Sequence, residues 1–143
     1  EIVEQTAVAE WGTHRVDEKA FVNEEGEILY APFDYAFPKN LPQFYGPEGT
    51  SAELLKNYIQ FSQILLNMKQ NIMQIYLSSR LSWEMRLQNG MLLKLGRSSE
   101  KIKPIDNLNR FVRFYSQFEK EFASNDASPK IIDLRYLRGL SWQ

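Results

Sequence analysis

A long alternation of apolar and polar residues, from position 73 to position 87, is the strongest constraint on how this chain folds. One set is Met73, Ile75, Leu77, Ser79, Leu81, Trp83, Met85 and Leu87, and the residues between them are Gln74, Tyr76, Ser78, Arg80, Ser82, Glu84 and Arg86. Because successive side chains of a strand point to opposite faces, the pattern predicts a β-strand with one apolar face. The run is about twice the usual strand length, so we expect a bend near Ser78 and Ser79.

The segments beside this run predict an antiparallel sheet. Asn89-Gly90 is a favoured hairpin pair, and residues 91–95 are expected to return as the partner strand. A second hairpin is predicted around residues 23–26, between the apolar runs 20–22 and 27–30. Residues 2–10 have extended character, and the Trp-Gly-Thr sequence at 11–13 suggests a break.

Two helices are predicted. Thr50 and Glu53 match a capping box, and an apolar stripe follows to about Lys69. The second helix begins near Pro104 and buries the stripe Leu108, Val112, Tyr115, Phe118 or Glu119, and Phe122. The order of these elements predicts an α+β fold, a mostly antiparallel and bent sheet with two helices packed on it.

The last fifteen residues, 129–143, form a further predicted strand. Ile132, Leu134 and Tyr136 would point to one face, and Asp133 and Arg135 to the other. We expect this last strand of the chain to lie at an open sheet edge, where its N–H and C=O groups can pair with another chain. The stretch therefore predicts a docking strand.

Composition excludes several classes of function. The chain has 143 residues, a net charge of −1, no cysteine and one histidine. It therefore lacks thiolate metal sites, cysteine nucleophiles and the basic field of a nucleic-acid-binding protein. No stretch approaches the ~18 consecutive apolar residues of a membrane span. The chain begins with Glu1, so we expect a fragment whose targeting or anchoring segment lies outside it.

Few residues suggest chemistry. His14, in a predicted loop, could act as a general base, but a lone exposed histidine is usually only solvated. Glu24, Glu25 and Glu27 do not have the spacing of a calcium loop. The Gly-Pro-Glu-Gly turn at 46–49 lacks the lysine expected of a phosphate site. We expect no enzyme, no metal and no cofactor.

Arg80 leaves two interpretations open. Between Ser78 and Ser82, it is predicted on the polar face of the long strand. It either decorates a solvated sheet face or pairs with an acidic partner laid across the sheet. Trp83, on the apolar face, is predicted in the core.

Five segments, in order, resemble the extracytoplasmic β-domain of the FtsQ/DivIB cell-division family, in the form found in Gram-negative bacteria. They are Leu-Pro-Gln-Phe-Tyr-Gly-Pro-Glu-Gly at 41–49, Arg-Leu-Ser-Trp at 80–83, Gln-Asn-Gly-Met-Leu-Leu-Lys-Leu-Gly-Arg at 88–97, Leu-Asn-Arg-Phe-Val at 108–112 and Ile-Asp-Leu-Arg-Tyr at 132–136. The sequence Val-Asn-Glu-Glu-Gly at 22–26 fits an early hairpin of that domain.

The resemblance implies a domain over residues 1–143, with 1–11 as the junction from a missing POTRA domain. The whole protein would be anchored in the inner membrane, with this domain in the periplasm at the division septum. Members of the family are not enzymes. They bind FtsB, with FtsL in the same complex, around the septal wall synthase.

The resemblance also implies a binding site. In the family, FtsB adds a strand at the C-terminal edge, and the corresponding positions here are Arg80, Tyr136 and Gly139. We expect Arg135 and Arg80 to pair with acidic groups and Tyr136 to act as an aromatic anchor. Leu137 and Arg138 depart from the family pattern, and Arg138 is expected to favour a more acidic partner. The alternative function is a small periplasmic ligand- or peptidoglycan-binding module that uses the aromatic loop at residues 33–45.

Overall fold

The computed structural model describes residues 6–15, 18–32, 40–124 and 131–135. Its elements, in chain order, are β1 (Ala7–Arg15), β2 (Glu18–Asn23), β3 (Ile28–Pro32), β4 (Gln43–Tyr45), α1 (Ser51–Leu65), the short 3₁₀ helix η1 (Leu66–Met68), β5 (Ile72–Leu77), β6 (Ser82–Leu87), β7 (Leu92–Arg97), α2 (Pro104–Ser124) and β8 (Ile131–Asp133).

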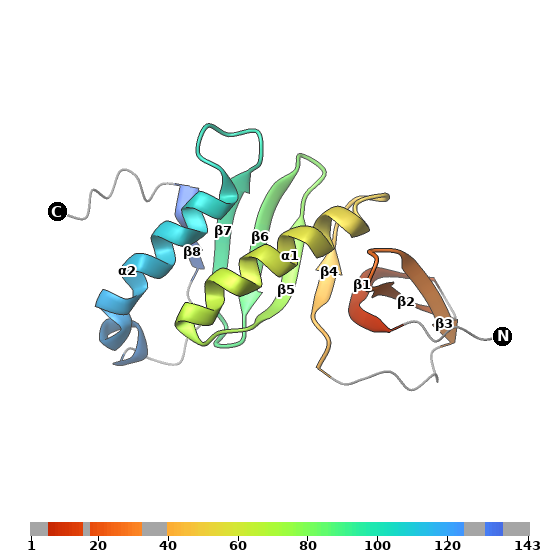
Figure 1. Ribbon diagram of the computed structural model, residues 1–143, viewed down its shortest axis with the longest axis horizontal. Coiled ribbons are helices and arrows are strands. Elements are labelled where there is room, and N and C mark those ends of the chain that lie inside the picture. Colours follow the sequence, from red (N-terminus) through yellow and green to blue (C-terminus); the bar gives the residue numbers. More distant parts are fainter. Residues whose placement is uncertain (1–5, 16–17, 33–39, 125–130, 136–143) are drawn as a thin grey trace.

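The described strands form one sheet with the order β3-β2-β1-β4-β5-β6-β7-β8. The pairs β1–β2, β2–β3, β5–β6 and β6–β7 are antiparallel, and the pairs of β4 with β1 and β5, and of β7 with β8, are parallel. Both helices lie on the same face of the sheet, with α1 in front of β5 and β6 and α2 in front of β7 and β8 (Figure 1). The predicted α+β fold with a mostly antiparallel sheet is confirmed.

The long alternating run is a hairpin and not a bent strand. β5 ends at Leu77 and β6 starts at Ser82, and the two pair antiparallel with Leu77 opposite Trp83. Ser78 closes the turn, because its carbonyl accepts from the Leu81 N–H at 2.8 Å and its hydroxyl accepts from the N–H groups of Arg80 and Ser82. From Gln74 to Leu77, odd-numbered residues of β5 pair with odd-numbered residues of β6, and even-numbered with even-numbered. The alternation is therefore the same for a hairpin and for one bent strand.

The two predicted helices and the early hairpin are confirmed. The β2–β3 turn is held by the Asn23 side-chain carbonyl, which accepts from the N–H groups of Glu25 and Glu27. α1 continues through η1, and Lys69, with a φ of 57°, ends it where the apolar stripe stops. The predicted capping box is wrong. The Thr50 hydroxyl donates to the carbonyl of Pro47, at 2.5 Å, and makes no cap hydrogen bond.

The predicted break at residues 11–13 is an irregularity within β1, because the strand continues through them to Arg15 while its register with β2 shifts between Trp11 and Arg15. Gly12 has a packing role there. A Cβ atom at this position would lie 2.1 Å from Cδ1 of Tyr45, whose ring stacks on Tyr76 with centroids 5.0 Å apart. β4, which carries Tyr45, was not predicted as a strand. It has only three residues and pairs with strands distant in the sequence.

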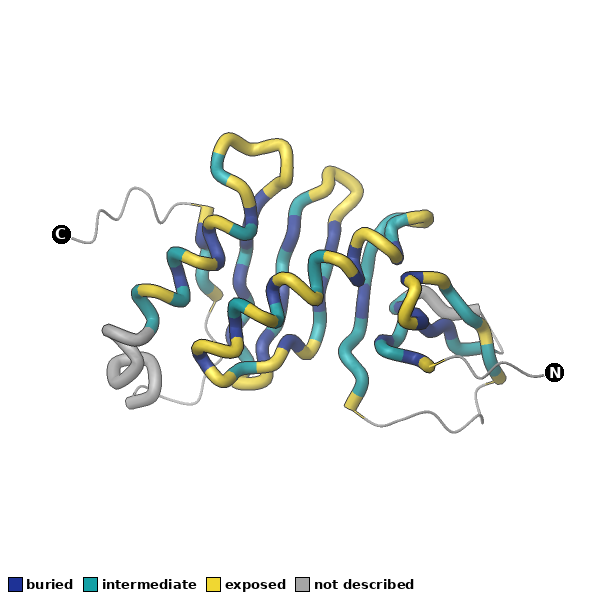
Figure 2. Tube along the Cα trace, in the orientation of Figure 1, coloured by how far each residue is buried: buried dark blue, intermediate teal, exposed yellow. Residues whose placement is uncertain are grey.

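One hydrophobic core lies between the sheet and the two helices (Figure 2). Trp83 is buried in it as predicted, and its ring meets Phe61 of α1 edge-on, with centroids 5.8 Å apart. Leu134 is fully buried and belongs to the same core. Burial of this residue fixes the end of β8 to the body of the domain. Within the described ranges, no helix is both long enough and apolar enough to cross a membrane.

Candidate protein-binding edge

β8 is the last strand in the sheet order, which confirms the prediction of a C-terminal edge strand. It pairs with β7 on one side, and no strand among the described residues pairs with its other side. The strand is shorter than the alternation predicted. Leu134 and Arg135 already form a 3₁₀ turn.

The register of β7 indicates which backbone groups of β8 face outward. The Leu87 N–H donates to the Met91 carbonyl at 2.8 Å, so the next pair in the β6–β7 ladder that exchanges hydrogen bonds is Met85 with Leu93. Leu92 and Lys94 then direct their groups toward β8, where Ile132 pairs opposite Leu93 and lies between them. It follows that the N–H and C=O groups of Ile131 and Asp133 point away from the sheet.

The side chains of β8 alternate between the two faces of the sheet. Ile132 is partly buried against the core, whereas Ile131 is 68% exposed. Ile131 lies beside Leu92, and Asp133 beside Lys94, on the sheet face opposite the helices. The strand is therefore anchored by Ile132 and by Leu134 after it, and Ile131 contributes little to the core.

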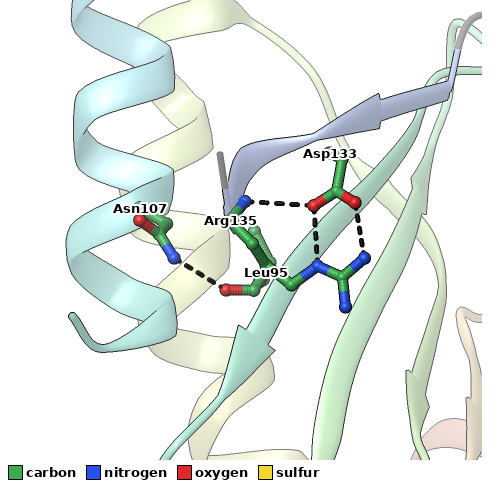
Figure 3. A network of polar contacts seen from close by, with 4 residues as sticks. All are labelled: Leu95, Asn107, Asp133 and Arg135. Atoms are coloured by element: carbon green, nitrogen blue, oxygen red, sulfur yellow. Dashed lines mark hydrogen bonds and ion pairs between the residues drawn. The ribbon is translucent and has the colours of Figure 1, made fainter. Parts of the chain in front are cut away.

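An ion pair closes the end of β8 (Figure 3). The Arg135 Nε atom donates to Asp133 Oδ1 at 2.7 Å, and its Nη2 atom donates to Oδ2 at 2.5 Å. The Arg135 backbone N–H also donates to Oδ1, at 3.1 Å. Hydrogen bonds from Arg135 hold the pKa of the Asp133 carboxyl below its ordinary value of 3.8, against the opposing effect of partial burial. The guanidinium is thus held at the open edge by a carboxylate two residues earlier.

The sequence predicted Arg80 on the polar face of a strand, but the structure does not place it on a sheet face. It occupies the turn between β5 and β6, where it is exposed. The reason is the hairpin itself, because the four residues 78–81 connect the two strands. The prediction that Arg80 is available to solvent still agrees with the structure, and its role in binding stays a prediction.

Strand direction brings Arg80 and Arg135 to one end of the sheet. β5, β7 and β8 run the same way, so the β5–β6 turn, the β7–α2 connection and the end of β8 share that end (Figure 1). The exposed cations there, which we call the cationic end, are Arg80, Arg97, Lys101, Lys103 and Arg135. Sequence reasoning missed Arg97, Lys101 and Lys103. Their position after the return strand of the hairpin at Asn89-Gly90 was the available signal.

The other predicted partner-binding residues, Tyr136, Leu137, Arg138 and Gly139, lie outside the described residues, and their roles stay predictions. His14 belongs to β1 and not to a loop. Among the described residues, no group of three or more His, Asp or Glu side chains could hold a metal ion.

The aromatic loop of the alternative function is described only from residue 40 onward. At that end, Phe44 is fully buried and its ring packs against Tyr58, with centroids 5.2 Å apart. Tyr45 stacks on Tyr76 within the sheet. These two rings serve packing, and the ligand-binding alternative for residues 33–45 stays a prediction.

The chain matches the model of a known protein family. The family described as "Cell division protein FtsQ/DivIB, C-terminal" matches residues 9–135, from β1 to the Arg135 turn. Both the core strands and the candidate edge therefore fall inside the matched region.

Curated relatives give the same result across Gram-negative bacteria. The chain is 31% identical over 140 residues to "Cell division protein FtsQ" of Neisseria gonorrhoeae, which covers 98% of this chain and 52% of the relative. The protein of the same name from Aliivibrio fischeri is 33% identical, covering 96% of this chain and 48% of the relative. That of Escherichia coli is 28% identical, with coverage of 96% and 47%. The chain spans about half the length of the curated relatives it matches.

Proposed function

The chain belongs to the FtsQ/DivIB family of cell-division proteins, and on that premise we propose that it is a non-catalytic divisome domain that binds FtsB. A segment of FtsB would add to the sheet as a strand beside β8, with FtsL in the same complex. The whole protein would be anchored in the inner membrane, with this domain in the periplasm at the division septum. Contact with components of the septal synthase belongs to the same proposal.

The observation that carries this proposal is the open edge at β8. Ile131 and Asp133 direct backbone donors and acceptors away from the sheet, as strand addition requires. The edge is firmly attached to the domain, because Ile132 and Leu134 pack into the core. An added strand would therefore pair with a preformed template.

Backbone pairing alone does not select a partner, since each hydrogen bond contributes only about 1 kcal/mol net. Side chains around the edge must supply specificity. The cationic end is suited to acidic groups, and Arg80 and Arg135 lie at its two sides, on the β5–β6 turn and after β8. An FtsB segment that carries Glu beside aromatic residues would suit these cations, with Tyr136 as the aromatic anchor.

Arg80→Glu tests the side-chain part of the proposal. We expect affinity for the periplasmic C-terminal segment of FtsB, measured by titration calorimetry, to fall about tenfold at low salt, because a rim cation becomes a repelling carboxylate. The difference should shrink at high salt. Lys56→Glu, an equal charge change on the exposed face of α1, is the matched control and should bind as the unaltered chain does.

Equal affinity of the Arg80 and Lys56 variants at low salt would make Arg80 an ordinary solvated cation. No binding of the FtsB segment to the unaltered chain would overturn the proposal that this domain binds FtsB.

A further inference from the structure

A bulge in β7 sets the end of the edge strand. Lys94 pairs with Glu84, but the next residue of β6, Trp83, pairs with Gly96, which leaves Leu95 as the extra residue on β7. A bulged residue loses its place in the ladder, and the strand bends there. β8 pairs with β7 only before this point, at Leu92, Leu93 and Lys94.

Asn107, in the first turn of α2, occupies the position beside the bulge. Its Nδ2 atom donates to the Leu95 carbonyl at 2.8 Å, and the residue is only 4% exposed (Figure 3). A buried carbonyl that the bulge removes from the ladder is thereby satisfied by a side chain instead of a strand. Nothing in the apolar spacing of α2 marks this asparagine.

Gly96 leaves room for the Arg135 side chain. If β8 continued in register, Arg135 would stand opposite Gly96, since Asp133 stands opposite Lys94. Gly96 has a φ of +93°, and a Cβ atom there would lie 3.1 Å from Cγ of Arg135 and 3.9 Å from Nδ2 of Asn107. The stem of Arg135 therefore packs closely against Gly96, and the positive φ of this residue favours glycine there.

We propose that Asn107 is a positioning residue for the binding edge. By holding the Leu95 carbonyl, it fixes the bend of β7 after Lys94, and with that bend the point at which the chain turns away from β7 after Asp133. That turn places Arg135 over Gly96 and against Asp133. The effect on partner binding rests on the proposed function, whereas the effect on the end of β8 does not.

The test compares Asn107→Ala and Asn107→Asp with the control Asn109→Ala, which changes an exposed asparagine of the same helix. In the free protein, amide hydrogen exchange is followed by NMR at Ile132, which pairs with β7, and at Arg135, which donates to Asp133. Loss of the donor should speed exchange at both about tenfold, as expected for one buried hydrogen bond. Asn107→Asp keeps the shape, loses the N–H and places a carboxylate against the Leu95 carbonyl, so exchange should be at least as fast as in Asn107→Ala. Asn109→Ala should exchange like the unaltered chain.

Affinity for the same FtsB segment should fall about fivefold to tenfold in both Asn107 variants. Unchanged exchange at Ile132 and Arg135 would overturn the inference. Equal acceleration in the β1–β2 ladder would also overturn it, because Asn107 would then support the whole fold and not the edge. If an Asn107 variant does not fold, Gly96→Ala takes its place, since its Cβ atom would crowd the Arg135 stem at 3.1 Å and should speed exchange at Arg135. Unchanged exchange at Arg135 in Gly96→Ala would overturn the inference. If the unaltered chain does not bind FtsB, the proposed function fails, and the exchange comparison still decides the role of Asn107.

Discussion

Replacing Ile131 with proline should abolish capture of the FtsB segment and leave the domain folded. The N–H that proline removes points away from the sheet, and the pyrrolidine ring would stand where an added strand must approach. Ile131 is 68% exposed, so the core loses little. We expect affinity to fall by about tenfold or more, and the melting temperature to change by about 2 °C or less.

Ile132→Pro is the contrasting variant, one residue further along the same strand. It removes a bond to β7 and a side chain that packs on the core, so it should lower the melting temperature clearly. Ile131→Val, which keeps the N–H, should bind as before. If Ile131→Pro binds FtsB as tightly as Ile131→Val, the partner does not pair with the outer side of β8.

Charge reversal at Arg135 should have the second large effect. Arg135→Glu replaces an acid-pairing cation with a carboxylate beside Asp133, which both repels an acidic partner and breaks the turn after β8. We expect affinity to fall about tenfold to a hundredfold at low salt. Lys69→Glu makes the same charge change before β5, at the opposite end of the sheet, and should have no effect on affinity.

The pH dependence of Asp133 gives an independent measurement on this variant. The pKa of Asp133 lies below 3.8 in the folded chain because Arg135 donates to it. The stabilisation from the pair is therefore complete above pH 3.8 and is lost as the pH falls through the folded pKa. An NMR titration of the Asp133 carboxyl should show its pKa rise in Arg135→Glu. An unchanged pKa would mean that the ion pair does not form in solution.

Alternation, turn pairs and apolar stripes were sufficient for the fold class, both helices and the early hairpin. They failed where the pattern is ambiguous or non-local. The alternation at 73–87 fits a hairpin and a bent strand equally well, because Leu77 and Trp83 face the same side in either case. β4 could not be recognised from three residues whose partners lie far away in the sequence.

The candidate site, too, was predictable only in part from local sequence patterns. The edge position of β8 followed from alternation and chain order, and the exposure of Arg80 followed from its polar neighbours. The gathering of Arg80, Arg97 and Arg135 at one end depends on strand direction, which only the complete topology provides. Asn107 was unpredictable for a different reason: its importance depends on a bulge at Leu95 that no local signal marks.

The most direct test of the binding edge is amide exchange in the chain with and without the FtsB segment. Strand addition predicts new protection at Ile131 and Asp133, whose N–H groups point outward, and little change at Ile132, which already pairs with β7. Binding that protects other amides, such as those of residues 40–45, and leaves Ile131 and Asp133 unprotected would contradict this account.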